Sequence, residues 1–177
     1  MSEVKKYTVD VEITGLAPLM HNNPNSMNTP NLHKEPIDVQ MDARVYKEGN
    51  KFVQPSNHII GALIKASTNF KMEGRGKKTF KDAVKGMVTI SPSNIPLGIK
   101  PVPDSRFCVL NHVSRITVTR PIYEGWKIGF KITVGDSNTL PLESLKDILV
   151  EAGQSVGIGT YRPTFGRFAV TKFEKVQ

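Results

Sequence analysis

The segment 156–168, with the sequence VGIGTYRPTFGRF, holds the residues of this chain that are best suited to bind a ligand. Gly157, Gly159 and Gly166 lie close together in it. Glycine adopts positive φ without a steric penalty and lets a ligand come near the backbone. Consecutive amides in such a turn form a concave nest that binds phosphate. The pattern predicts a phosphate-binding loop, although a tight helix-to-strand connection uses the same residues.

Three side chains in this loop extend the same chemistry. Arg162 and Arg167 carry planar guanidinium groups that bind phosphate with two parallel hydrogen bonds. Tyr161 offers a ring on which a base could stack. We therefore expect the two glycines Gly157 and Gly159, together with these three side chains, to contact nucleic acid. The alternative is that both arginines are simply solvated.

A second cationic feature is the stretch 71–85. It contains two acidic residues, Glu73 and Asp82, and six basic ones, which are Lys71, Arg75, Lys77, Lys78, Lys81 and Lys85. Its net charge of +4 is half of the net charge of +8 that the whole chain carries. Such a basic arm suits contact with phosphates of any sequence. An ordinary solvated loop is the alternative.

The composition limits the class of protein. A chain of 177 residues with 38% hydrophobic content suits one domain over residues 1–177. The excess of 24 basic over 16 acidic residues favours a polyanionic partner. Cys108 is the only cysteine, which fits a reducing compartment, and no apolar run is long enough to span a membrane. We expect a cytoplasmic protein.

Catalysis has weaker support than binding. Gly157 and Gly159 follow a predicted helix, so the dinucleotide fingerprint fails, and Gly76-Lys77-Lys78-Thr79 lacks the first glycine of a P-loop. The four histidines show no metal-binding spacing, so we expect no metal and no cofactor. We expect no catalytic residue; the alternative is His21 as the general base of a metal-independent endoribonuclease.

The hydrophobic periodicity predicts strands at residues 7–13, 113–118, 126–134 and 167–173, and helices at 56–70 and 142–152. Gly153 is the expected cap of the second helix. Residues 123–125 should join the second and third strands as a hairpin. Segments 16–50 and 71–107 read as insertions, because asparagine and proline recur in the first and glycine and proline in the second. The order βαββαβ predicts an α+β, ferredoxin-like (RRM-like) fold with one open sheet face.

Two motifs resemble the RAMP superfamily of CRISPR-associated proteins. The first is the glycine loop before the last strand. The second is VQPSNHIIGALIK at residues 53–65, which is similar to the "Pro-Gly-Ser-Ser-Leu-Lys-Gly-Ala-Leu-Arg" helix start of the effector subunits that coat guide RNA. The matching residues are Pro55, Ser56, Gly61, Ala62 and Leu63. The glycine after the proline is missing, Asn57 replaces a small residue, and Lys65 replaces the arginine.

The two insertions occupy the positions of the fingers and thumb in these backbone subunits, so the resemblance spans most of the chain. It implies a non-catalytic protein that coats single-stranded RNA or DNA as a head-to-tail oligomer, or beside other CRISPR effector subunits. The segments 18–22 and 157–166 also resemble small proteins of tailed phages and prophages. A phage-encoded relative could act in a CRISPR complex or, as a protein-binding inhibitor, against one. The choice between RNA and single-stranded DNA stays open.

Overall fold

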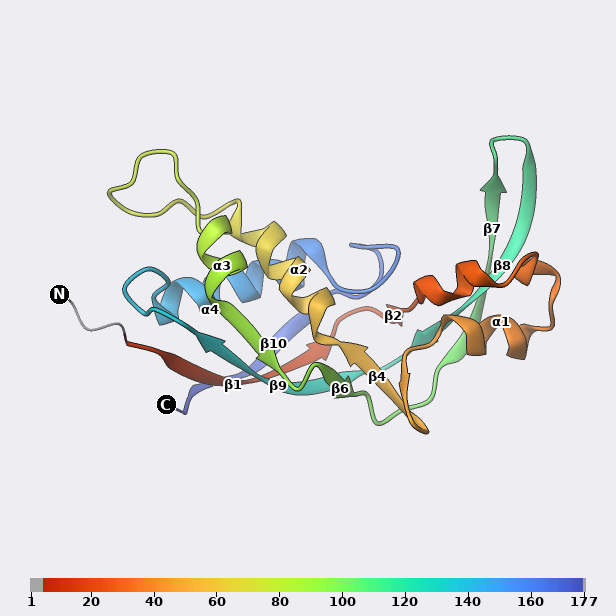
Figure 1. The fold of residues 1–177 in the computed structure, drawn as a ribbon, viewed down its shortest axis with the longest axis horizontal. Coiled ribbons are helices and arrows are strands. Elements are labelled where there is room, and N and C mark those ends of the chain that lie inside the picture. Colours follow the sequence, from red (N-terminus) through yellow and green to blue (C-terminus); the bar gives the residue numbers. More distant parts are fainter. Residues whose placement is uncertain (1–4, 177) are drawn as a thin grey trace.

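The computed structural model describes residues 5–176 and contains a four-stranded antiparallel sheet as its main feature (Figure 1). The strands lie in the order β10-β1-β9-β5. Their bounds are Tyr7–Gly15 for β1, Val88–Ser91 for β5, Lys127–Val134 for β9 and Phe168–Lys175 for β10. The predicted alternation is confirmed in β1 and β9, where every second side chain is buried.

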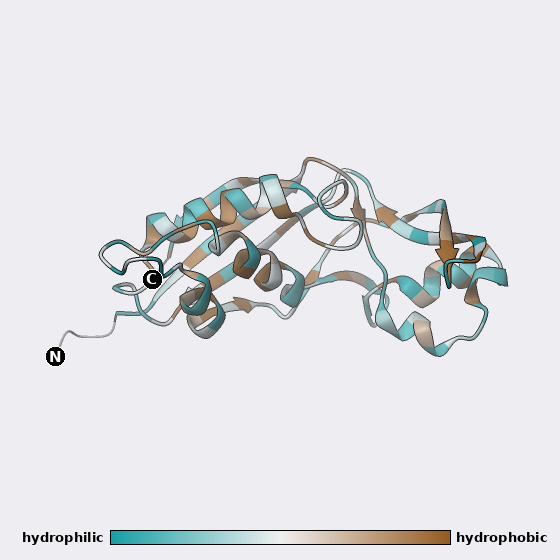
Figure 2. Ribbon diagram, turned by 90° about the horizontal axis from the view of Figure 1, so that it is seen from above, coloured by the Kyte–Doolittle hydropathy of each residue, from teal (hydrophilic) through white to brown (hydrophobic). Residues whose placement is uncertain are grey.

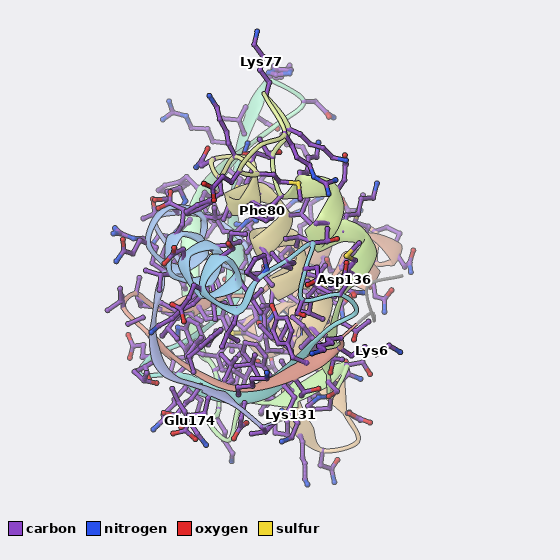
Figure 3. All side chains as sticks on the ribbon, turned by 90° about the vertical axis from the view of Figure 1, so that its left-hand side faces the viewer. Lys6, Lys77, Phe80, Lys131, Asp136 and Glu174 are labelled. Atoms are coloured by element: carbon purple, nitrogen blue, oxygen red, sulfur yellow. The ribbon has the colours of Figure 1, made fainter. Side chains whose placement is uncertain are left out.

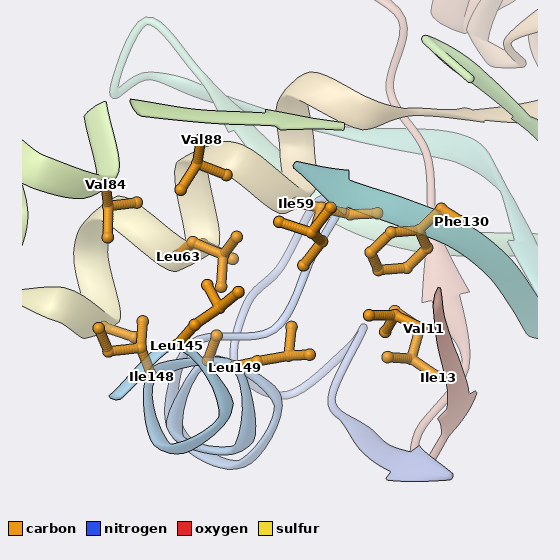
Figure 4. Close-up of a cluster of buried hydrophobic side chains, with 14 of the residues drawn as sticks. Val11, Ile13, Ile59, Leu63, Val84, Val88, Phe130, Leu145, Ile148 and Leu149 are labelled. Atoms are coloured by element: carbon orange, nitrogen blue, oxygen red, sulfur yellow. The ribbon is translucent and has the colours of Figure 1, made fainter. Parts of the chain in front are cut away.

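Three helices pack on one face of this sheet: α2 (Ser56–Ser67), α3 (Lys81–Met87) and α4 (Leu142–Glu151). Apolar side chains three and four residues apart point inward from α2 and α4 (Figure 4). They pack against Val11 and Ile13 of β1 and Phe130 of β9 in one continuous core. We call this sheet with its helices the main lobe.

A distal lobe lies at the other end of the elongated molecule, as Figures 1 and 2 show from two directions. It contains the three-stranded sheet β2-β8-β7, in which β2 is Leu19–Met20, β7 is Val102–Leu110 and β8 is Ser114–Tyr123. The short helix α1 (Ile37–Arg44) and the 3₁₀ turn Leu32–Lys34 pack on β8, and the 3₁₀ turn Pro24–Asn28 packs on α1. A small third sheet has the order β3-β4-β6, with bounds Lys47–Glu48, Lys51–Pro55 and Asn94–Pro96.

The α+β class expected from the sequence is confirmed, but the predicted hairpin is wrong. Strand β8 pairs with β7 and β2, whereas β9 pairs with β1 and β5. The two strands expected to pair therefore belong to different sheets. The strand beside β9 is β5, which lies inside the segment 71–107 that reads as an insertion.

The segment 71–107 is thus a mixture of core and distal elements. It contains α3, β5, β6 and the first part of β7. Its prolines lie where a missing N–H costs no ladder hydrogen bond: Pro103 and Pro96 are in the edge strands β7 and β6, and Pro92 and Pro101 lie outside the strands. Its basic stretch is not a free arm either, because Met72, Phe80 and Val84 are buried in the main core.

The predicted helices differ from the observed ones at their ends. Helix α2 ends at Ser67, three residues before the predicted end, and α4 continues through a π turn (Ala152–Val156) past Gly153. Gly153 is therefore no cap: a β-carbon there would collide with the backbone oxygen of Phe168. The chain leaves the helical path at Gly157, whose φ is +74°. In the described residues no helix is long and apolar enough to cross a membrane.

Candidate nucleic-acid interface

The glycine loop runs from the π turn to β10 and lies between the two lobes (Figure 1). Gly157, Gly159 and Gly166 all have positive φ, at +74°, +82° and +78°. Two of the loop amides bind the 18–20 segment: Thr160 N–H donates to the Met20 carbonyl at 2.8 Å, and Gly166 N–H donates to the Pro18 carbonyl at 2.8 Å.

These hydrogen bonds occupy two of the amides that could form the expected phosphate nest, and the nest itself stays a prediction. The close backbone approach at Gly159 is made to the Met20 carbonyl, because a β-carbon at Gly159 would collide with that oxygen. Gly166 packs equally tightly on Ile158, whose amide donates to the Gly166 carbonyl at 3.0 Å. The glycines therefore hold the loop on the 18–20 segment.

A cleft of about 750 Å³ opens beside this loop. Its walls come from Gly61 and Lys65 of α2, from Ser155 and Val156, and from residues 159–163 of the loop. Lys65 and Arg162 are exposed cations, and no carboxylate lines the cleft among the residues that the structure describes. Gly61 leaves open space on the helix, since a β-carbon there has no heavy atom within 4 Å. The cleft is thus a groove with two cationic side chains in its wall.

Tyr161 connects the cleft to the distal lobe. Tyr161 is 44% exposed, and the centroid of its ring lies 5.3 Å from the guanidinium carbon of Arg120 and 6.0 Å from that of Arg106. The Arg106 guanidinium also covers the Phe165 ring at 4.8 Å. Guanidinium groups over aromatic faces form favourable cation–π contacts. The expected base-stacking ring is therefore set in a cluster of arginines, with part of its surface open.

Cys108 lies in the same cluster. Its Sγ is 3.6 Å from Arg120 Nη1 and 3.8 Å from the Tyr161 hydroxyl. Burial raises the pKa of the thiol, but hydrogen bonds from Arg120 and Tyr161 and the nearby charges of Arg120 and Arg44 leave it below its ordinary value. The sequence identifies Cys108 only as a lone cysteine and misses this environment.

The basic stretch 71–85 lies on the main lobe, away from the distal lobe (Figure 1). All six of its basic side chains are exposed, and none of them forms an ion pair in the part of the chain that the structure describes. Lys77 lies at the tip of the loop (Figure 3). The stretch and the Tyr161 cluster are thus two separate cationic surfaces. Arg167 is also exposed, at the start of β10.

His21 has no surface on which to act as a general base in this structure. The residue is 0% exposed, and its Nε2 donates to Gln54 Oε1 at 2.8 Å. Gln54 Nε2 in turn donates to His58 Nδ1 at 2.9 Å. Burial lowers the pKa of His21 to about 4, which keeps the imidazole neutral near pH 7. This geometry gives His21 a structural role and does not support it as the general base of the nuclease alternative.

The open face of the main sheet is polar and balanced in charge. Lys172 pairs with Asp10 at 2.7 Å, and Lys127 pairs with Glu12 at 3.1 Å. In the four strands of this sheet every aromatic side chain of the described residues lies on the helix-covered side. Base-stacking platforms need exposed rings. Nucleic-acid contact is therefore better supported on the loop side than on this face.

No protein-family model matches the sequence, and no curated protein matches it. Among solved structures, the chain is similar to one chain of "Cryo-EM structure of the Type III-B Cmr-beta bound to cognate target RNA", with a TM-score of 0.67 and 15% identity. The match covers 98% of this chain but only 61% of that chain. At this identity the likeness shows the fold alone.

Proposed function

We propose that this protein is a non-catalytic nucleic-acid-binding protein that coats a single strand through its phosphates. The observation that carries this proposal is the continuous cationic surface beside the glycine loop. Lys65 and Arg162 line one cleft with Tyr161, and the Tyr161 ring contacts Arg106 and Arg120 of the distal lobe. Among the described residues of this surface, Asp104 is the one carboxylate, and it forms an ion pair with Arg106.

The likeness to a chain of an RNA-bound effector complex supports RNA as the strand. In this proposal the main lobe is a ferredoxin-like palm of the RAMP type, because its elements follow the order β1, α2, β5, β9, α4, β10, with the short helix α3 added between α2 and β5. The first insertion and the β7–β8 hairpin take the places of fingers and thumb. Since this chain spans 61% of its neighbour's length, effector-subunit partners and phage origin are parts of the same proposal.

The proposed contacts are independent of base sequence. Guanidinium and ammonium groups bind phosphates, which every nucleotide carries, and Tyr161 can stack on any base. The exposed side chains of the stretch 71–85 add a second group of phosphate contacts on the main lobe. Gly157 and Gly159 serve this interface by holding the loop in place.

Assembly into a head-to-tail oligomer is supported by the apolar end of the β7–β8 hairpin. Phe107 is 79% exposed and Val113 is 90% exposed, and Val109 lies between them in the sequence. Exposed apolar groups that cluster mark surfaces for partners. A heterologous contact that does not close on itself extends into a filament. Electron microscopy with long single-stranded RNA tests this, and isolated monomers at saturating protein would refute it.

Fluorescence anisotropy with a labelled single-stranded RNA tests the interface itself. Arg162→Gln removes a cleft cation, and its matched control is Lys131→Gln, which removes a cation from the open sheet face. Figure 3 shows Lys131 on the opposite side of the molecule from Lys77. We expect Arg162→Gln to weaken binding and Lys131→Gln to leave it nearly unchanged. Equal weakening by both variants would mean that only overall charge matters, and the assignment of the cleft would fail.

A further inference from the structure

A second cationic pocket, which we call the arginine pocket, lies in the distal lobe. Its volume is about 270 Å³, and no carboxylate lines it among the described residues. Its walls are the segment 22–33, Arg44 at the end of α1, and the β8 side chains Ile116, Val118 and Arg120. The volume lies below the range of about 300 to 1,000 Å³ that is typical for drug-sized ligands. The arginine pocket therefore suits a single small group.

Two arginines in this pocket have no acidic partner. Arg44 is buried, and its Nη1 donates to the Gln40 carbonyl of its own helix at 3.1 Å. Arg120 is half-buried, and its Nε is shielded from solvent without a hydrogen-bond partner. Neither residue forms an ion pair in the described chain. Burial and the nearby charge of Arg120 lower the pKa of Arg44.

Such an arrangement is unfavourable while the arginine pocket is empty. A buried charged donor without an acceptor loses its hydration, and two cations side by side repel each other. An oxyanion between Arg44 and Arg120 would offset both costs, because guanidinium groups bind tetrahedral oxyanions through two parallel hydrogen bonds. The serine, threonine and asparagine side chains of the wall supply neutral polar groups around it: Asn22, Ser26, Thr29 and Asn31.

We propose that the arginine pocket binds one phosphate group between Arg44 and Arg120. The source of that phosphate rests on the proposed function, in which it is a phosphodiester of the bound strand. Inorganic phosphate presents the same oxygens and is the probe for the pocket alone. None of the residues that we predict from the sequence to bind nucleic acid lines this pocket.

Titration of the wild-type protein with inorganic phosphate, followed by NMR of the arginine Nε–H groups, tests the pocket. The Arg120 Nε–H signal should shift in a saturable way. Arg115 provides the internal control, because it lies on the same strand but its side chain occupies the opposite sheet face. The Arg115 signal should stay unchanged. An unshifted Arg120 signal, or equal shifts for both arginines, would overturn the proposal.

The single cysteine gives an independent measurement. A phosphate beside Arg44 and Arg120 neutralises the charges that lower the pKa of Cys108. Inorganic phosphate should therefore move the pH profile of Cys108 alkylation by iodoacetamide to higher pH, and sodium chloride at equal ionic strength should not. Arg120→Lys keeps the positive charge but loses the planar guanidinium group, so the affinity for phosphate in this assay should fall on the order of tenfold. The same pH shift with chloride would refute a specific site.

A parallel titration with single-stranded RNA separates this proposal from the proposed function. If RNA binds but neither RNA nor inorganic phosphate shifts the Arg120 signal, the proposed phosphate site is refuted and the proposed binding function stands. If inorganic phosphate shifts Arg120 but RNA does not bind, the pocket stands and the proposed function fails. If both hold, Arg120→Gln should reduce the slope of log affinity against log salt by about 0.7, the value for one lost contact to a single strand.

Discussion

Replacement of Gly159 by alanine perturbs the attachment of the glycine loop to the 18–20 segment. Gly159 has a φ of +82°, and an added β-carbon would collide with the Met20 carbonyl oxygen and lie 2.9 Å from the Leu19 side chain. The sequence alone suggests that this glycine serves a ligand, so that a substitution would affect binding only. The structure instead predicts that the folded state itself is destabilised.

The magnitude follows from two contributions. A residue with a β-carbon in the left-handed region costs about 1 to 2 kcal/mol. Displacing the loop from Met20 also weakens the 2.8 Å hydrogen bond from Thr160 N–H, which is worth about 0.5 to 1.5 kcal/mol. Gly159→Ala should therefore lower the free energy of unfolding by about 2 to 3 kcal/mol. Valine at this position should cost more.

Equilibrium urea denaturation measures this change, and Gly61→Ala is the matched control. Gly61 lines the same cleft, but its added β-carbon points into open space on α2. Because alanine is the better helix former, Gly61→Ala should raise the free energy of unfolding by about 0.5 to 1 kcal/mol. An unfolding midpoint of Gly159→Ala equal to that of the wild type would refute the packing argument.

Three further outcomes are expected. The free energy of unfolding of the wild type should keep the full contribution of His21 above about pH 6.5 and fall as the pH drops toward 4, because the unfolded chain protonates His21 while the folded pKa of His21 is about 4. The loss is on the order of 3 kcal/mol, and a urea midpoint that does not change over this pH range would contradict it. Single-stranded RNA affinity should fall by orders of magnitude between about 50 and 200 mM salt, with a shallower slope for Arg162→Gln; an affinity independent of salt would rule out phosphate contacts. Glutamine at Arg75, Lys77 and Lys78, which are exposed and outside the core, should reduce cooperative binding on long RNA more than binding to a short oligonucleotide, and an equal loss on both would contradict it.

The sequence predicts those parts of the fold whose pattern is local. Strands β1 and β9 alternate buried and exposed residues, and helices α2 and α4 carry apolar residues three and four apart. Each of these elements packs against a single core, so its buried side chains repeat with the period of a strand or of a helix. The glycine loop is predictable for the same reason, because its three glycines all require positive φ.

The pairing of β8 is not predictable from such local signals. The actual turn before β8 uses Asn111 and His112, with φ of +51° and +59°, and contains no glycine. Gly125, which looks like the turn residue of a hairpin, lies where the chain passes from one sheet to another. Periodicity tells which face of a strand is buried, but not against which sheet.

The arginines of the candidate interface are hidden from sequence reasoning by their separation. Arg44 ends a short helix of the first insertion, while Arg106 and Arg120 lie on β7 and β8. The alternation of Arg106 and Cys108 on one strand places them on a common face, but it does not identify Tyr161 as their neighbour. Only the packing of the glycine loop on the distal lobe brings these side chains together.

The glycine loop therefore sets the geometry of the whole cationic surface. One end of it follows α4, and its amides bind the 18–20 segment, whose strand β2 pairs with β8. A loop released from Met20 would move Tyr161 and Arg162 away from the arginines of the distal lobe. The cleft and the arginine cluster would then present their charges at independent positions. Under the proposed function, Gly159 therefore acts on binding through the position of Tyr161 and Arg162, because a site keeps its geometry only when the residues around it hold it in place.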